Sequence, residues 1–263
     1  MLLRKIERVR GGREMKKYAK KGWIALIALC ILVLGNTMTL KASVKEQKPA
    51  YTSKGLEYYV QADKKSVAVK IQNKKETVKI PESVKIRGKK YVVTEIKCTA
   101  IPHDTLVLGK KANIARDDKE YFKNTKTKTI TIPKTVKKIE TGAFSYYTKL
   151  TKVTVAKGNK NYKSTSQGIF SKNGKVLIYA VPGSGTYKVK AGVVKIAPRA
   201  FVGTKYSKVI LPESCNEIGT RAFFKCRNLK KIQGGSLCIC GDYAFFGTKV
   251  KGVDKYGTML FAI

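Results

Sequence analysis

The residues able to do catalytic or metal chemistry are few in this sequence, and their spacing does not assemble a site. His103 is the only histidine, so a Ser-His-Asp triad or a metal site would have to form around that one side chain. Cys238 and Cys240 form a Cys-x-Cys pair, which differs from the Cys-x-x-Cys spacing of zinc sites. The sequence has no glycine-rich phosphate loop. We therefore predict a protein that is not an enzyme and that uses no cofactor and no metal.

The cysteines are better explained as structural residues. Five of them follow the apolar N-terminal segment, and an odd number does not indicate a disulfide framework. Cys215 and Cys240 fall at hydrophobic positions of the repeat described below, so we expect them to be small core residues. Cys226 is expected to be a thiol of low reactivity, because apolar burial raises the pKa of a thiol. Cys238 is expected to be more exposed than Cys240.

Positive charge is the strongest chemical signal in the chain. The 55 lysines and arginines outnumber the 17 aspartates and glutamates, which gives a net charge of +38. Such an excess favours polyanionic partners, and acidic glycans, wall polymers and host matrix are the candidates. Nucleic acid would suit the charge but conflicts with the secretion signal described below. A second interpretation also stays open, in which scattered lysines only keep the surface solvated.

Many of the lysines that carry this charge lie in a segment of the chain that repeats itself. Three copies of one phrase are KIETGAFSYYTKLTKV (138–153), KIAPRAFVGTKYSKV (195–209) and EIGTRAFFKCRNLKKI (217–232), and a weaker copy is CGDYAFFGTKVKGV (240–253). The last three copies place Phe201, Phe223 and Phe245 at a spacing of 22 residues. A fixed period in this range predicts a solenoid, in which each coil packs on the next.

Stacked coils place equivalent residues in columns. In each repeat, one short strand should join a parallel sheet at about 4.8 Å from its neighbour. One predicted column is aliphatic and sulfur-containing: Ile139, Ile196, Ile218 and Cys240. Another is an aromatic core column: Phe144, Phe201, Phe223 and Phe245.

Three lysines are the candidate binding residues. Lys152, Lys208 and Lys231 each precede the apolar residue that starts a predicted strand, so we expect them to stack. Like charges on neighbouring strands destabilise a sheet slightly. A polyanionic partner would offset that cost. The alternative is that these long side chains only extend into solvent.

The repeat motif also resembles a known family. The segments IPKTVKKIETGAFSYYTKLTKV (132–153) and LPESCNEIGTRAFFKCRNLKKI (211–232) are similar to the BspA-type bacterial-surface leucine-rich repeat family. The resemblance covers roughly residues 55–253. It implies a secreted or surface-attached binding protein, since some family members are adhesins, and it provides no catalytic residues.

The resemblance and the residue pattern together predict the domain organisation. The fold class is mainly β with short turns or helices: a leucine-rich-repeat solenoid with a parallel sheet, an N-terminal β cap and an inserted β-hairpin. The predicted boundaries follow the chain: leader 1–43, linker 44–54, β cap 55–95 and solenoid 96–263. Within the solenoid, residues 159–187 are the inserted hairpin, and Asn173-Gly174 marks its turn.

The N-terminal segment predicts export from the cell. Within the leader, translation is expected to start at Met15, and residues 15–43 are typical of a secretory signal peptide, with a basic start and an apolar run. The mature protein would then be secreted or lie at the cell surface, and its only contact with a membrane would be this segment. If the segment is not cleaved, the protein would be a structural component of the cell envelope, tethered by an N-terminal helix.

Overall fold

The fold is known here for five stretches of the chain. The computed structural model describes residues 48–72, 75–98, 126–145, 147–235 and 238–253. The chain divides into two compact units, Met1–Glu46 and Gln47–Ile263, and all described residues belong to the second. The predicted leader 1–43, with Met15, and His103 therefore lie outside the described residues.

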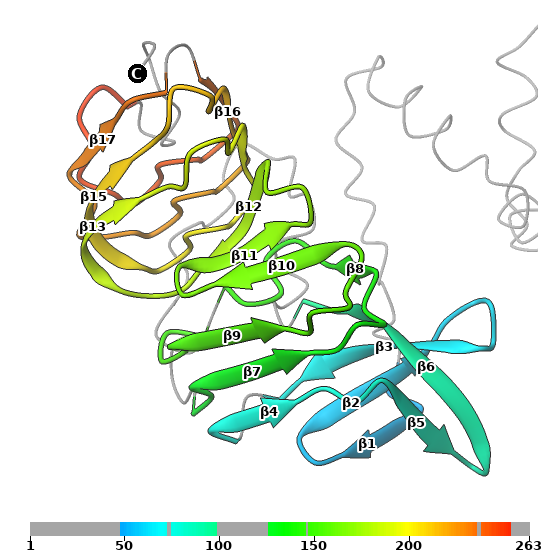
Figure 1. Cartoon of the computed structure of the whole chain (residues 1–263). Helices are drawn as coiled ribbons and strands as arrows, with labels where there is room; N and C mark the ends of the chain where they lie inside the picture. Colours follow the sequence, from blue (N-terminus) through cyan, green and yellow to red (C-terminus); the bar gives the residue numbers. More distant parts are fainter. Residues whose placement is uncertain (1–47, 73–74, 99–125, 146, 236–237, 254–263) are drawn as a thin grey trace, which may run out of the picture. The chain divides into compact units, whose positions relative to one another are not determined.

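Every regular element in the described stretches is a β-strand. Figure 1 shows the strands as arrows, coloured from blue to red along the chain. Consistent with this, no helix suited to crossing a membrane is found among the described residues. The fold is therefore built from sheets and the turns that join them.

The cap sheet combines antiparallel hairpins with parallel pairing. Five of its strands are consecutive or nearly so in the sequence: β1 (Tyr51–Ser53), β2 (Leu56–Val60), β3 (Ser66–Ile71), β5 (Ser83–Ile86) and β6 (Lys89–Ile96). Antiparallel pairing joins β1 to β2, β2 to β3 and β5 to β6. Parallel pairing joins β3 to β6, and β6 to the short β8 (Lys138–Ile139) of the first clean repeat. The sheet therefore connects cap and solenoid through backbone hydrogen bonds.

Parallel ladders of strands form the solenoid. The first ladder of longer strands contains β4 (Thr77–Lys79), β7 (Thr129–Ile132) and β9 (Lys152–Val155). The second contains β13 (Ser184–Lys188), β15 (Lys205–Ile210) and β17 (Lys231–Gln233). Short strands form a third: β14 (Lys195–Ile196), β16 (Glu217–Ile218) and β18 (Ile239–Cys240). The solenoid fold predicted from the repeats is confirmed.

Each repeat contributes two strands to parallel sheets, where one was predicted. The short strand precedes the Ala-Phe turn and the longer strand follows it, and hydrogen bonds between coils continue through the turn itself. The amide of Phe201 donates to the carbonyl of Ala222, and the amide of Phe223 donates to that of Ala244, both at 2.8 Å. Because the turn is tight, both of its flanks are extended and can pair with the next coil.

The predicted hairpin is part of a larger antiparallel meander of β10 (Tyr162–Thr165), β11 (Gly168–Ser171) and β12 (Val176–Ala180). The turn between β11 and β12 holds Gly174 at φ 79°, and its amide donates to Ser171 at 2.8 Å. β12 then pairs in parallel with β14. The last strand of the meander is thus also the first strand of the short ladder.

Asn159 fixes the entry to this meander. Its buried side-chain amide donates to the carbonyls of Pro133 (3.0 Å) and Val136 (2.9 Å). Its side-chain oxygen accepts from the amides of Asn161 and Tyr162, both at 2.8 Å. The four bonds satisfy backbone groups of the preceding coil and of the start of the meander, which explains why a buried polar side chain is tolerated here.

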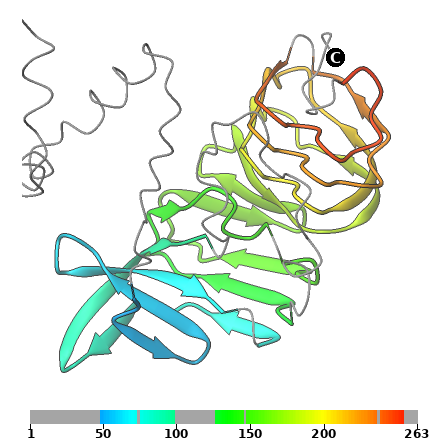
Figure 2. The same ribbon diagram turned by 180° about the vertical axis from the view of Figure 1, so that it is seen from behind.

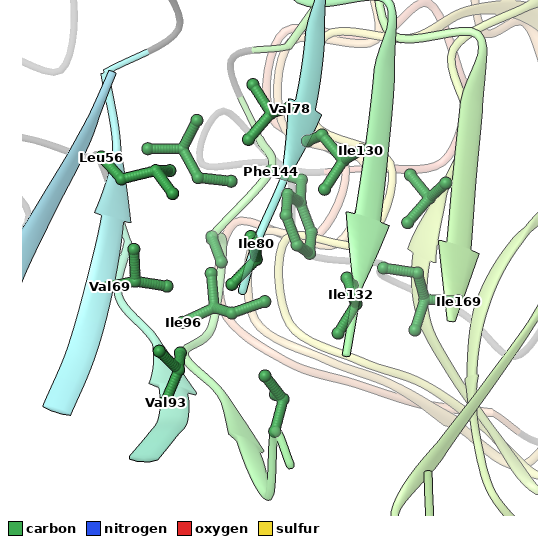
Figure 3. Packing of buried hydrophobic residues seen from close by; sticks show 14 of the residues in the cluster. Leu56, Val69, Val78, Ile80, Val93, Ile96, Ile130, Ile132, Phe144 and Ile169 are labelled. Atoms are coloured by element: carbon green, nitrogen blue, oxygen red, sulfur yellow. The ribbon is translucent and has the colours of Figure 1, made fainter. Parts of the chain in front are cut away.

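The buried side chains form two clusters, and Phe144 belongs to the first. That cluster joins cap strands to the first long ladder, and Figure 3 shows Phe144 within it, together with Ile80, Ile130 and Ile132. Phe144 packs against Tyr147 and Tyr179, with ring centroids at 6.1 and 5.4 Å.

The second cluster holds the other three phenylalanines. Phe201 stacks on Phe223 at 4.7 Å between ring centroids, and Phe223 stacks on Phe245 at 5.3 Å. The predicted aromatic column is therefore shorter than expected, because the meander separates the coil of Phe144 from that of Phe201. For the same reason Ile139 pairs with Ile96, while Ile196 pairs with Leu177 and Ile218.

Candidate functional site

The ladder of β13, β15 and β17 brings together two of the three candidate lysines. Lys208 lies directly opposite Lys231, and Val209 lies opposite Ile232 in the same register. Figure 2 shows these coils from behind, in yellow-green to orange. Side chains alternate between the faces of a strand, so the buried Val209 and Ile232 fix the neighbouring lysines on the outer face.

This alignment is electrostatically unfavourable in isolation. Two like charges directly opposite on neighbouring strands destabilise a sheet. The strand before them offers Thr186 at the same position, opposite Lys208. Lys208 is half-buried and Lys231 is exposed, so the repulsion is only partly screened by water.

A shallow pocket adjoins Lys231 at the next coil. It is open to solvent, has a volume of about 430 Å³ and is lined by six residues: Lys230, Lys231, Ile232, Lys249, Val250 and Lys251. We call these six residues the lysine pocket. All four of its lysines are exposed, and no acidic residue lines it. Ion pairs in the described part of the chain include those of four lysines outside this pocket: Lys128, Lys134, Lys138 and Lys195.

Lys152 lies elsewhere, contrary to the predicted stack of three. It belongs to β9, in the ladder of β4 and β7, and its partner on the neighbouring strand is Thr129. The ladder of β9 ends at the meander, and β13 begins a separate ladder. Lys152 is therefore not paired with Lys208. The structure thus pairs two of the three candidate lysines and separates the third from them.

The sequence comparison of repeats missed Lys230, Lys249 and Lys251. A signal for them exists in the sequence, because Lys230 adjoins Lys231 and the segment KVKGV (249–253) ends the weaker repeat. The last coil is shorter than the others, however. The amide of Lys249 bonds to Leu229, 20 residues earlier, whereas the amide of Lys230, at the same place in the preceding coil, bonds to Ser207, 23 residues earlier. A fixed 22-residue offset therefore misplaces these lysines.

Four of the cysteines lie in or beside the second core. Cys215 and Cys226 are buried, while Cys238 and Cys240 are both half-buried. The thiol of Cys226 donates to the carbonyl of Phe201 at 2.9 Å and lies 3.5 Å from the hydroxyl of Thr204. Burial raises the pKa of Cys226 to about 11. At neutral pH this thiol is therefore protonated, and it serves to satisfy a backbone carbonyl.

The Ala-Phe turns carry a partly exposed group of aromatic rings with an arginine stacked on them. Phe224 stacks on Phe246 at 5.4 Å, and the guanidinium of Arg221 lies over the rings of Phe224 (5.7 Å) and Tyr243 (5.5 Å). Arg221 and Tyr243 both have φ 57°, where Gly142 stands in the first clean repeat at φ 75°. The stacking holds non-glycine residues in a conformation that L side chains rarely adopt.

The described residues contain no group of three histidine, cysteine or acidic side chains that could hold a metal ion. His103, which was considered as a catalytic centre and set aside on the sequence, lies outside those residues. The described residues do offer a pocket lined by four lysines and by no acidic residue, and such a pocket can bind anions.

Comparison with known proteins identifies the repeats. A family model described as a BspA type leucine rich repeat region matches residues 117–188 and 194–257, in six copies. These two ranges make up more than half of the chain. No protein with curated annotation matches this sequence.

The chain also matches solved structures of leucine-rich repeat proteins, at low identity and low TM-score. The T. pallidum leucine rich repeat protein TpLRR is 18% identical, with a TM-score of 0.41, and the match covers 76% of this chain and 89% of that one. The pneumococcal vaccine antigen PcpA is 16% identical, with a TM-score of 0.35 and coverage of 78% and 81%. A leucine rich cell surface protein of Faecalibacterium prausnitzii is 18% identical, with a TM-score of 0.35 and coverage of 80% and 57%. At this identity, nothing about function follows from these structures.

Proposed function

Because this chain belongs to the BspA-type leucine-rich repeat family, we propose that it is a secreted or cell-surface binding protein of bacterial type without enzymatic activity. It presents a basic repeat surface to a polyanionic partner, which is an acidic glycan, a wall polymer or a component of host matrix. The family supports the first part, since its repeats generally act as scaffolds for interaction.

The observation that carries the second part is the pairing of Lys208 with Lys231. Opposite charges or uncharged polar residues at these two positions would keep the sheet soluble and make it more stable than two lysines do. The four lysines of the lysine pocket extend the same unneutralised charge to the next coil. A bound polyanion would neutralise these charges and stabilise the folded protein through mass action.

The test is binding of the purified protein to an array of acidic glycans, wall polymers and matrix proteins at two salt concentrations. We expect retention on polyanions that falls as salt rises, because salt screens exposed charges beyond about 8 Å at physiological ionic strength. Lys208→Gln with Lys231→Gln should weaken retention and flatten its salt dependence. Lys152→Gln is the matched control, since Lys152 is an exposed ladder lysine opposite a threonine. Binding that is unchanged in the double variant would refute the proposed surface.

Fractionation of cells tests where the protein resides. A secreted protein would occur in the culture medium with its N-terminus processed near residue 43. Retention in the membrane with an unprocessed N-terminus would instead favour the tethered envelope protein.

A further inference from the structure

We propose that the lysine pocket binds one phosphate or sulfate ester unit carried on a sugar or polyol frame. The proposal rests on the proposed function and adds to it which site makes the contact and which unit of the polyanion enters it.

The pocket has a fixed backbone frame. Its residues come from two successive coils, and hydrogen bonds hold both coils in place. The amide of Lys230 donates to Ser207 at 2.9 Å, and the amide of Lys249 donates to Leu229 at 2.8 Å. The amide of Val250 lies 3.3 Å from the hydroxyl of Thr248. The lysine side chains therefore start from defined positions around one cavity.

The composition of the pocket points to an anion attached to carbon. Four lysines supply ammonium groups, while Ile232 and Val250 supply an apolar floor that continues into the second core. An inorganic anion would use the ammonium groups and leave the floor in water. The carbon face of a sugar or polyol would cover the floor, and burial of apolar surface is favourable.

The size of the pocket and the number of its lysines indicate more closely which chemical unit could bind. The pocket is shallow and open to solvent, and its volume of about 430 Å³ gives room for a small unit that stays partly in water. It therefore suits one unit of a polymer and not a long segment. Lysine ammonium groups act as separate point charges. A tetrahedral oxyanion offers oxygens in several directions to such charges, whereas a carboxylate offers two oxygens in one plane.

The experiment measures the affinity of the full chain for four probes by titration calorimetry. They are a glycerol phosphate oligomer, a sulfated disaccharide, a uronic acid oligomer and inorganic tripolyphosphate. We expect the phosphodiester or the sulfated probe to bind most tightly, and which of the two does so tells whether a wall polymer or a sulfated glycan is the source. Equal or tighter binding of the uronic acid oligomer or tripolyphosphate would overturn the assignment.

Two sets of variants test the residues. Lys249→Gln with Lys251→Gln should weaken binding of the preferred probe about tenfold, since each exposed ion pair contributes a factor of about two to five. Val250→Thr keeps the shape of the side chain and adds a hydroxyl to the floor. It should weaken the preferred probe and leave tripolyphosphate unchanged. Lys152→Gln should change neither.

The outcomes separate this inference from the proposed function. If the protein binds polyanions and the pocket variants bind as well as the wild type, the pocket is wrong and the basic repeat surface stands. If the unmodified protein binds none of the four probes and no polyanion on the array, both are refuted.

Discussion

The ring of Phe223 lies almost parallel to that of Phe245, with 8° between the ring planes and 5.3 Å between the centroids. Phe201 covers the other face of Phe223, so the side chain of Phe223 is enclosed between two coils. Phe223→Ala should lower the free energy of unfolding by about 3–5 kcal/mol, the usual range for a buried aromatic. Chemical denaturation measures this. Phe246→Ala, at a half-buried ring, is the control with the smaller loss, and a loss below about 1 kcal/mol for Phe223→Ala would contradict its place in the core.

Gly219 lies where two coils approach each other closely. A Cβ atom added there would be 2.5 Å from the backbone nitrogen of Pro198, and backbone cannot move aside as a flexible side chain can. Gly219→Ala should therefore destabilise the protein by about 1–3 kcal/mol, as overpacking usually does. Gly158→Ala is the matched control, since its Cβ would meet only the side chain of Lys134 at 3.6 Å. Thermal melting of the two variants should show a loss for the first alone, and equal melting temperatures would contradict the prediction.

The stability of the protein should depend on which side chain replaces Asn159. Asn159→Ala removes four hydrogen bonds. The two carbonyls that it leaves without the Asn159 donor are buried, and a buried unsatisfied group costs about 1–3 kcal/mol. Asn159→Asp keeps the acceptor and loses the donor, and it places a carboxylate against the carbonyls of Pro133 and Val136.

The aspartate variant therefore has a pH dependence that the alanine variant lacks. Repulsion and burial raise the pKa of the new carboxyl in the folded state above its value in the unfolded chain. The protonated form is then favoured by folding, so stability should be greatest at low pH and fall as the pH rises through the folded-state pKa. Denaturation at pH 4 and pH 7 measures this, relative to the wild type. Equal losses at both pH values would show that the carboxylate is accommodated.

Lys231→Glu should move stability and binding in opposite directions. It converts the repulsion with Lys208 into an attraction, worth about 0.2–1 kcal/mol for a cross-strand pair. The same change removes a cation from the lysine pocket and adds an anion, so polyanion binding should fall. Lys152→Glu faces Thr129 and should not raise stability. A loss of stability in Lys231→Glu would mean that the paired lysines do not repel each other.

Cys226 should react slowly with alkylating reagents in the native protein. Its thiol is buried and its pKa is raised to about 11 by burial, so almost no thiolate exists at pH 8. Site-resolved mass spectrometry after labelling at pH 8 measures this, with labelling in denaturant as the control. Rapid native labelling would contradict the structure around this residue.

The same raised pKa has a consequence for stability. Burial raises the pKa of the Cys226 thiol from about 9, its ordinary value in an unfolded chain, to about 11 in the folded protein. Folding therefore favours the protonated form. This contribution is present below about pH 9 and is lost as the pH rises toward 11. The difference in stability between wild type and Cys226→Ala should shrink over that interval, and a constant difference would show that Cys226 does not titrate as the structure implies.

The sequence predicted best the features that repeat at a constant offset. Phe201, Phe223 and Phe245 stack because successive coils differ by 22 residues, and the same offset aligns Ile196 with Ile218. Local pattern is sufficient here, since each coil pairs only with its neighbours.

The features that escaped prediction depend on contacts between distant segments. The pairing of β12 with β14 leaves no trace in the local pattern of either strand, yet it separates Phe144 and Lys152 from the later repeats. The shortened last coil has a similar effect, because the register of Lys249 is set by its bond to Leu229. The Asn173-Gly174 pair predicted the turn of the hairpin, but the use of its second strand as a ladder strand is a tertiary property.

The backbone hydrogen bonds that join successive coils determine how such a protein can change its length in evolution. From Ile196 through Ile218 to Cys240 the pairing is the same at each step, and the turns bond in the same way from Phe201 to Ala222 and from Phe223 to Ala244. A tandem duplication or deletion of one 22-residue unit in this region keeps every remaining coil next to a partner of the right shape. Gene slippage can therefore lengthen or shorten the stack of coils by one unit at a time, while the cap and the meander stay as they are.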